Sequence, residues 1–112
     1  MALQKYMKFG FALPVWLAAC AQSPESIQPS YVSPSEYSGW SCSAMRAEAG
    51  RVNDALAVAS KQQSNARSGD VAGVILLGLP VSSLSGANVA PEVARLKGHK
   101  EVIERTMNQQ SC

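Results

Sequence analysis

The chain has 112 residues, which is enough for one small domain and too few for two. Ten basic and eight acidic side chains give a formal net charge of +2, but Lys5 and Lys8 lie in an N-terminal segment that we expect to be removed. The remaining chain is neutral, with both signs interleaved. It lacks the basic surface that binds phosphate backbones, so nucleic acid is not expected as a partner.

Residues 1–19 have the layout of an export signal. Lys5 and Lys8 give a positive start, and residues 9–17 form an apolar core. This core is too short to cross a bilayer as a helix, which takes about 20 residues. It ends in the box Leu17, Ala18, Ala19 and Cys20. The small residues give a peptidase access to the backbone, and the cysteine supplies a thiol.

This box resembles the lipobox of small bacterial lipoprotein precursors. The resemblance implies that residues 1–19 are a signal peptide and that Cys20 carries covalent diacylglycerol and an N-acyl chain, with no other cofactor. Two or more acyl chains hold a protein on a membrane stably, at about 0.8 kcal/mol per buried CH₂. Lipoproteins that stay in the inner membrane often carry aspartate directly after the cysteine, whereas this chain has Ala21 there. The resemblance therefore favours the outer membrane, with the protein facing the periplasm. Ordinary secretory cleavage, with Cys20 present by chance, is the alternative.

Residues 20–40 are predicted to be a lipidated Pro/Ser-rich linker. The three prolines restrict the residues before them to extended conformations, so we expect a semi-rigid tether that lifts the rest of the protein from the membrane. The aromatic side chains that follow the signal peptide all lie here, at Tyr31, Tyr37 and Trp40. They either lie at the lipid headgroups or pack on the end of the following helix, and we expect packing.

Two amphipathic helices are predicted in residues 41–112. The first covers about 43–67, with Ser41 or Ser43 as its N-cap and Gln63 interrupting its apolar face. That face consists of Met45, Ala49, Val52, Leu56, Ala59 and Ala66. The second begins near Asn88 to Pro91, with Asn88 as its N-cap and Pro91 in its first turn. Its apolar face consists of Val89, Val93, Leu96, Ile103 and Met107.

Several polar and small residues of the second helix carry separate expectations. The spacing of Glu92 with Arg95, and of Glu101 with Arg105, predicts ion pairs on an exposed face. Gly98 weakens the helix, so either the helix bends there or another backbone comes close. His99 has no neighbour at metal-ligand spacing and is predicted to be an exposed, ordinary histidine.

An apolar run, residues 71–81, separates the helices and contains Pro80. It is too short to span a membrane. Four structures are compatible with it: a continuation of the first helix into a hydrophobic tip, a buried turn, a self-association surface and a membrane-inserting loop. A buried element is the expected one, with self-association and membrane contact retained. The residues expected at such a contact are Val74, Ile75, Leu76, Leu77 and Leu79.

Cys42 and Cys112 flank the two helices, so their side chains meet if the helices form an antiparallel hairpin. Export places them in an oxidising compartment, where a disulfide persists. Such a bridge stabilises by about 4 kcal/mol in the chain-entropy model. Unrelated thiols, or a bridge to another subunit, are the alternatives. The predicted fold is therefore mainly α, with a signal peptide and an extended linker before a two-helix hairpin with an apolar connection.

No constellation of catalytic residues is recognisable in the sequence. Paired carboxylates, a histidine with a nucleophile, a phosphate-binding glycine loop and a metal-spaced cluster are all missing, so neither an enzyme nor a small-molecule substrate is expected. The pattern favours a membrane-anchored envelope lipoprotein with a structural or accessory protein-interaction role. Its partners would be the membrane, a second copy or a larger envelope complex. The alternatives are a membrane-active or exclusion-type lipoprotein, and a non-catalytic subunit of an envelope enzyme or transport complex.

Overall fold

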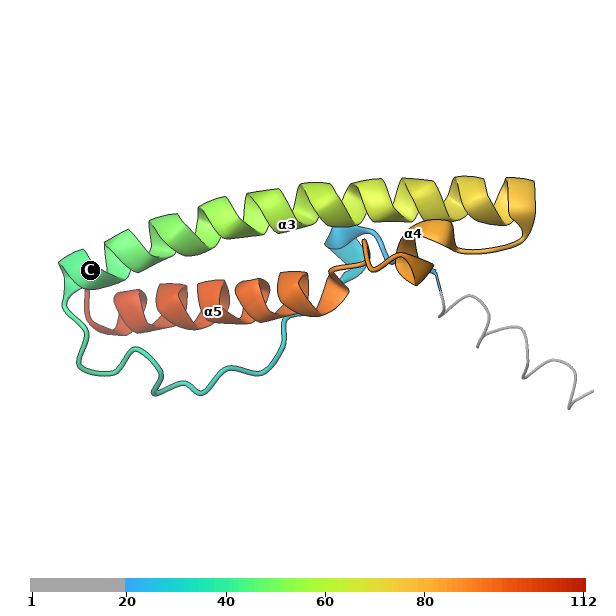
Figure 1. Cartoon of the computed structure of the whole chain (residues 1–112). Helices are drawn as coiled ribbons and strands as arrows, with labels where there is room; N and C mark the ends of the chain where they lie inside the picture. The colour runs from blue at the N-terminus through green and yellow to red at the C-terminus, as the bar shows by residue number, and fades with distance from the viewer. Residues whose placement is uncertain (1–19) are drawn as a thin grey trace, which may run out of the picture.

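The computed structural model describes residues 20–112, which are mainly helical and contain no strand (Figure 1). The elements are the 3-10 turn η1 (Pro24–Ser26) and the helices α3 (Cys42–Leu77), α4 (Val81–Leu84) and α5 (Ala90–Gln109). α5 lies beside the first part of α3 and runs in the opposite direction (Figure 1). The helical hairpin is therefore confirmed. The predicted cleavage residues Leu17, Ala18 and Ala19 lie outside the described residues.

α3 is longer than its periodicity predicted. Ser41 is its N-cap, and the Ser41 side chain accepts a hydrogen bond from the Ala44 backbone N–H at 3.1 Å. No proline interrupts the next 36 residues, which span about 54 Å at 1.5 Å per residue. The helix ends only at Gly78, whose left-handed φ of 73° is accessible to glycine without strain. The predicted end near residue 67 was too early, because the residues that stop a helix, Gly78 and Pro80, come about ten positions later.

The core lies between α3 and α5. Met45, Val93 and Ile103 are almost completely buried, as the apolar stripes predicted. Val102, which was outside the predicted stripe, is also buried. α5 is covered on more than one side, because α3 packs on one face and the N-terminal segment runs along another (Figure 1).

The N-terminal segment, residues 20–40, is not a tether, and this prediction is corrected. It folds back along the helices, where the Ser30 N–H donates to the Ala94 carbonyl at 2.9 Å. The Lys97 ammonium donates to the Ile27 carbonyl at 2.9 Å and also to that of Pro24. Prolines keep the segment extended, but an extended chain still packs where it carries apolar side chains, and Ile27 is only 5% exposed.

Gly98 is where this segment comes closest to α5. A Cβ added to Gly98 would collide with the carbonyl oxygen of Ser30 and lie 2.9 Å from a methyl of Val32. Of the two explanations predicted for this glycine, the close approach of another backbone is the one found.

The disulfide Cys42–Cys112 joins the beginning of α3 to the residues just after α5, with 5.6 Å between the two Cα atoms. The bridge closes a loop across a sequence separation of 70 residues. It holds together the end of the hairpin opposite the α3–α4 connection.

α5 begins at Ala90, within the predicted range of Asn88 to Pro91, but its N-cap is one residue after the predicted Asn88. Val89 is the N-cap and Pro91 lies in the first turn. The Asn88 side chain accepts a 3.2 Å bond from the Ala90 N–H and donates one to the Ser83 hydroxyl at 3.1 Å. Both predicted ion pairs are present, and each joins its nitrogen and oxygen at 2.7 Å. They are Arg95–Glu92 and Arg105–Glu101.

Candidate functional site

The end of the hairpin opposite the disulfide exposes an apolar surface, which we call the apolar tip. It comprises the exposed apolar side chains Val71, Val74, Ile75, Leu76, Leu77, Leu79, Val81 and Leu84. Ile75 and Leu76 are 76% and 78% exposed. The expectation that this run is buried was wrong, because α3 continues beyond the start of α5 and only the short α4 folds back on it (Figure 1).

Two glycines allow α4 to pack closely on α3. A Cβ on Gly73 would lie 2.5 Å from the Leu79 carbonyl oxygen and 2.7 Å from a methyl of Val81. A Cβ on Gly69 would collide with the Ser82 hydroxyl. The chain therefore turns back tightly at the tip. The apolar side chains on the other faces of α3 are left uncovered.

Asp70 joins three parts of the chain at the base of the tip. Its carboxylate is fully buried and accepts hydrogen bonds from the backbone N–H groups of Ala21 at 2.8 Å and Ser83 at 2.7 Å. The Ser83 hydroxyl donates to it as well. This role of Asp70 was not predicted from the sequence. A lone acid immediately before an apolar run was the available signal.

Gln63 acts in the same way about two turns earlier on α3. Its fully buried amide donates to the Gln22 carbonyl at 3.0 Å and accepts from the Val89 N–H at 2.7 Å. Gln63, which interrupts the apolar stripe, therefore ties two segments to α3: the N-terminal segment at Gln22 and the residues before α5 at Val89. We call Gln63 and Asp70, with these bonds, the polar latch.

The surroundings of Asp70 favour its charged form. Burial raises the pKa of the carboxyl, but hydrogen bonds from Ser83, Ala21 and Ser82 lower it and outweigh burial. The pKa of Asp70 therefore lies below its ordinary value, and the latch contains a carboxylate at neutral pH.

Cys20 lies directly before the residue that the latch holds. Its thiol is free and half-buried, and Ala21 is 4% exposed. The beginning of the described chain is beside α4, at the same end of the molecule as the apolar tip (Figure 1). The residue predicted to carry acyl chains and the residues predicted to contact a membrane or partner are thus brought together.

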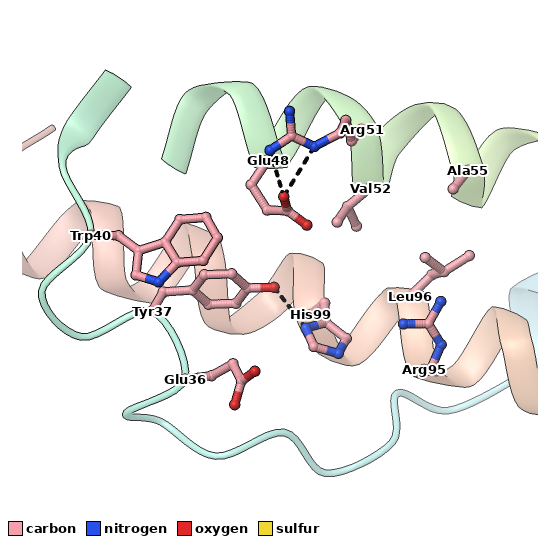
Figure 2. A pocket seen from close by; sticks show the side chains of 10 residues that line it. All are labelled: Glu36, Tyr37, Trp40, Glu48, Arg51, Val52, Ala55, Arg95, Leu96 and His99. Carbon is pink, nitrogen blue, oxygen red and sulfur yellow. Dashed lines mark hydrogen bonds and ion pairs between the residues drawn. The ribbon is translucent and has the colours of Figure 1, made fainter. Parts of the chain in front are cut away.

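A second candidate surface is a groove of about 340 Å³ toward the disulfide end, between residues 36–40 and the two helices (Figure 2). The Tyr37 hydroxyl lies 2.7 Å from Nδ1 of His99, and the Tyr37 ring packs edge-on to Trp40 with centroids 5.0 Å apart. His99 is half-buried and bonded, so the prediction of an exposed histidine is corrected. The aromatic side chains were expected to pack on the end of the following helix, α3. Tyr37 also packs against α5.

The charges around this groove are largely balanced. Burial, followed by Glu48 and Glu36, raises the pKa of Tyr37, whereas Arg95 lowers it. The guanidinium of Arg51 bonds to Glu48 at 2.7 Å, and that of Arg95 bonds to Glu92 at the same distance. The groove therefore presents aromatic faces and arginines that are already paired with carboxylates.

Residues 20–112 contain neither a candidate metal site nor a candidate membrane span. Within this range no group of three or more His, Cys, Asp or Glu residues is placed to hold a metal ion. No helix among these residues is both long and apolar enough to cross a membrane. Comparisons with protein families, curated proteins and solved structures found no match to the chain.

Proposed function

We propose that this protein is a bacterial envelope lipoprotein, anchored through acyl chains on Cys20, with a structural or accessory role. The observation that carries the proposal is the position of Ala21. This residue, the first after the lipobox cysteine, is buried and bonded to Asp70, so packed structure reaches the residue next to the terminus that removal of residues 1–19 would leave. An anchor at Cys20 would be joined directly to the hairpin. The outer membrane, on its periplasmic side, is the proposed location.

A rod anchored in this way presents its other end to the periplasm. From Asp70 to Cys42, α3 rises about 42 Å, and the groove with Tyr37 and Trp40 lies toward that distant end. Tyr, Trp and Arg are the residues most enriched where proteins bind one another. We assign the groove to contact with a protein of the envelope, either a larger complex or an enzyme or transporter that this chain assists.

Intact mass spectrometry of the protein from a membrane fraction tests the anchor. The expected mass is that of residues 20–112 plus acyl chains, and Cys20→Ser should lose both the acyl mass and the membrane association. An unacylated chain cut elsewhere would reject the lipoprotein proposal.

Co-purification tests the accessory role. The lipidated protein, solubilised in mild detergent after crosslinking, should carry a defined partner that Trp40→Ala loses. Tyr31→Ala is the matched control, because Tyr31 is 85% exposed on the same segment and outside the groove. Equal capture by both variants would reject the groove as the contact, and a lone monomer in every preparation would reject the accessory role.

The exposed apolar tip favours a second candidate, a membrane-active or exclusion-type lipoprotein. Such a protein should release dye from lipid vesicles, and Leu76→Asp should abolish the release. If neither form causes leakage, the membrane-active role is excluded.

A further inference from the structure

We propose that the apolar tip inserts into the same lipid leaflet that holds the acyl chains of Cys20, at a depth set by the polar latch. The inference rests on the proposed anchor at Cys20 and adds a second membrane contact, made by the protein itself. It commits the tip to lipid and not to a protein partner.

The geometry suits a shallow insertion. Asp70 holds Ala21 at 2.8 Å, so the Cys20 sulfur, which would carry the diacylglycerol, stays near this level of α3. From Asp70 to Leu77 the helix rises about 10 Å. Interfacial helices bury their apolar faces about 5–10 Å into the boundary between headgroups and acyl chains. When the glycerol is at the interface, a tip of this length can therefore reach the acyl chains.

The tip also carries no charge. Residues 71–91 contain no Asp, Glu, Lys, Arg or His, and the carboxylate at the base of the tip, Asp70, is buried with its hydrogen bonds made. A surface that contacts lipid must avoid charged side chains, because each costs several kcal/mol to bring into the hydrocarbon.

Part of the backbone of the turn is also paired within the chain. The N–H groups of Gly78 and Leu79 donate to the carbonyls of Val74 and Gly73 at 3.0 and 3.4 Å. In α4, the Leu84 N–H donates to the Pro80 carbonyl at 3.0 Å. Each of these bonds lowers the cost of placing a helix end and a turn in a medium without water, and a shallow insertion leaves the other carbonyls of the turn within reach of the headgroups.

A second copy of the chain is a poorer occupant. The tip has eight exposed apolar side chains at one end of a rod, whereas a stable protein interface uses about 20–30 residues from each side. The anchor would also hold the tip against lipid whether or not another copy was present. The leaflet is therefore the partner that the position and chemistry of the tip fit.

A tryptophan reporter tests the insertion in the lipidated full-length protein. Trp40 is the single tryptophan after residue 20, so Leu76→Trp combined with Trp40→Phe places one reporter on the tip. Leu76 is exposed, so the larger ring does not disturb the core. In vesicles of phosphatidylethanolamine and phosphatidylglycerol, lipids brominated in the upper acyl chain should lower its emission by about twofold or more, because an inserted tip lies at that depth. Trp40 in the wild type is the matched control and should not be quenched.

The possible results separate the inference from the proposed function. Acylated protein with an unquenched, water-exposed reporter overturns the insertion and leaves the anchor intact. An unquenched but blue-shifted reporter, together with crosslinked dimers, assigns the tip to a second copy. Protein without acyl mass rejects the anchor, and the insertion with it.

Asp70→Asn in the reporter background tests the latch. The amide replaces one acceptor oxygen by a donor and weakens the hold on Ala21, so quenching should fall. Glu25→Gln is the control, since it changes a nearby exposed carboxylate outside the latch. Circular dichroism on both variants shows whether the hairpin persists. Unchanged quenching in a folded Asp70→Asn protein would overturn the role of the latch in setting depth.

Discussion

At the scale of single residues, the two fully buried polar side chains of α3 decide how the chain is assembled. Gln63 and Asp70 occupy positions where an apolar residue would continue the buried face. Each instead bonds to the N-terminal segment and to the chain after α3. A buried polar group left without partners costs about 1–3 kcal/mol, so these bonds favour one register of the three segments.

Asp70→Ala should lower the free energy of unfolding by about 2–4 kcal/mol, because the N–H groups of Ala21 and Ser83 lose their acceptor in a buried site. Urea unfolding followed by circular dichroism measures the change. Asp54→Ala is the control, since the exposed Asp54 should contribute within about 0.5 kcal/mol. Similar stabilities of the two variants would contradict the latch.

The stability should also fall in acid through Asp70. Its folded pKa lies below the unfolded value of about 3.9, so its contribution is complete above about pH 4 and is lost as the pH falls toward the folded pKa. Urea unfolding from about pH 6 to pH 2 should show a steeper acid loss in the wild type than in Asp70→Asn. Parallel curves would mean that the Asp70 pKa is not lowered by folding.

Gly98→Ala should destabilise the protein by about 1–3 kcal/mol, although alanine is the better helix former, because the new Cβ meets the Ser30 carbonyl. Gly50→Ala is the matched control in α3. Nothing lies within 4 Å of a Cβ at Gly50, so this variant should gain about 1 kcal/mol. Thermal and urea unfolding of the pair measure the contrast, and stabilisation by both substitutions would argue that residues 30–32 do not pack on α5.

At the scale of elements, the unequal lengths of α3 and α5 create the tip. α3 has 36 residues and α5 has 20, so the hairpin closes at the disulfide end and leaves the last turns of α3 with only α4 beside them. The stabilising bridge and the exposed apolar surface therefore lie at opposite ends. Loss of the bridge should loosen the hairpin without altering the tip directly.

Replacing both Cys42 and Cys112 by serine should lower the free energy of unfolding by about 2–4 kcal/mol, because the unfolded chain regains the freedom of a long loop. Unfolding of oxidised wild type against the double variant measures this. Peptide mapping of native material should recover the two cysteines in one crosslinked fragment. Cys20→Ser is the control and should leave the stability unchanged. Recovery of Cys42 and Cys112 as free thiols from native envelopes would contradict the bridge.

At the scale of the whole molecule, the sequence predicted the features that depend on neighbours along the chain. The spacing of Met45, Val52 and Val93 marked the helix faces, and the spacing of Glu101 and Arg105 marked an ion pair; both are present. The pairing of Cys42 with Cys112 followed because an antiparallel hairpin brings its outer ends together.

Only the tertiary structure decided which residues that are far apart in the sequence are neighbours in space. The proline-rich segment packs on α5 because α3 covers only part of that helix and Ile27 and Tyr37 bury their side chains against the rest. The composition of the segment does not reveal this packing. The apolar run is exposed because α5 begins too late to cover it. Local periodicity thus determined the two helices and their inner faces, whereas the polar latch and the apolar tip depended on contacts between distant residues.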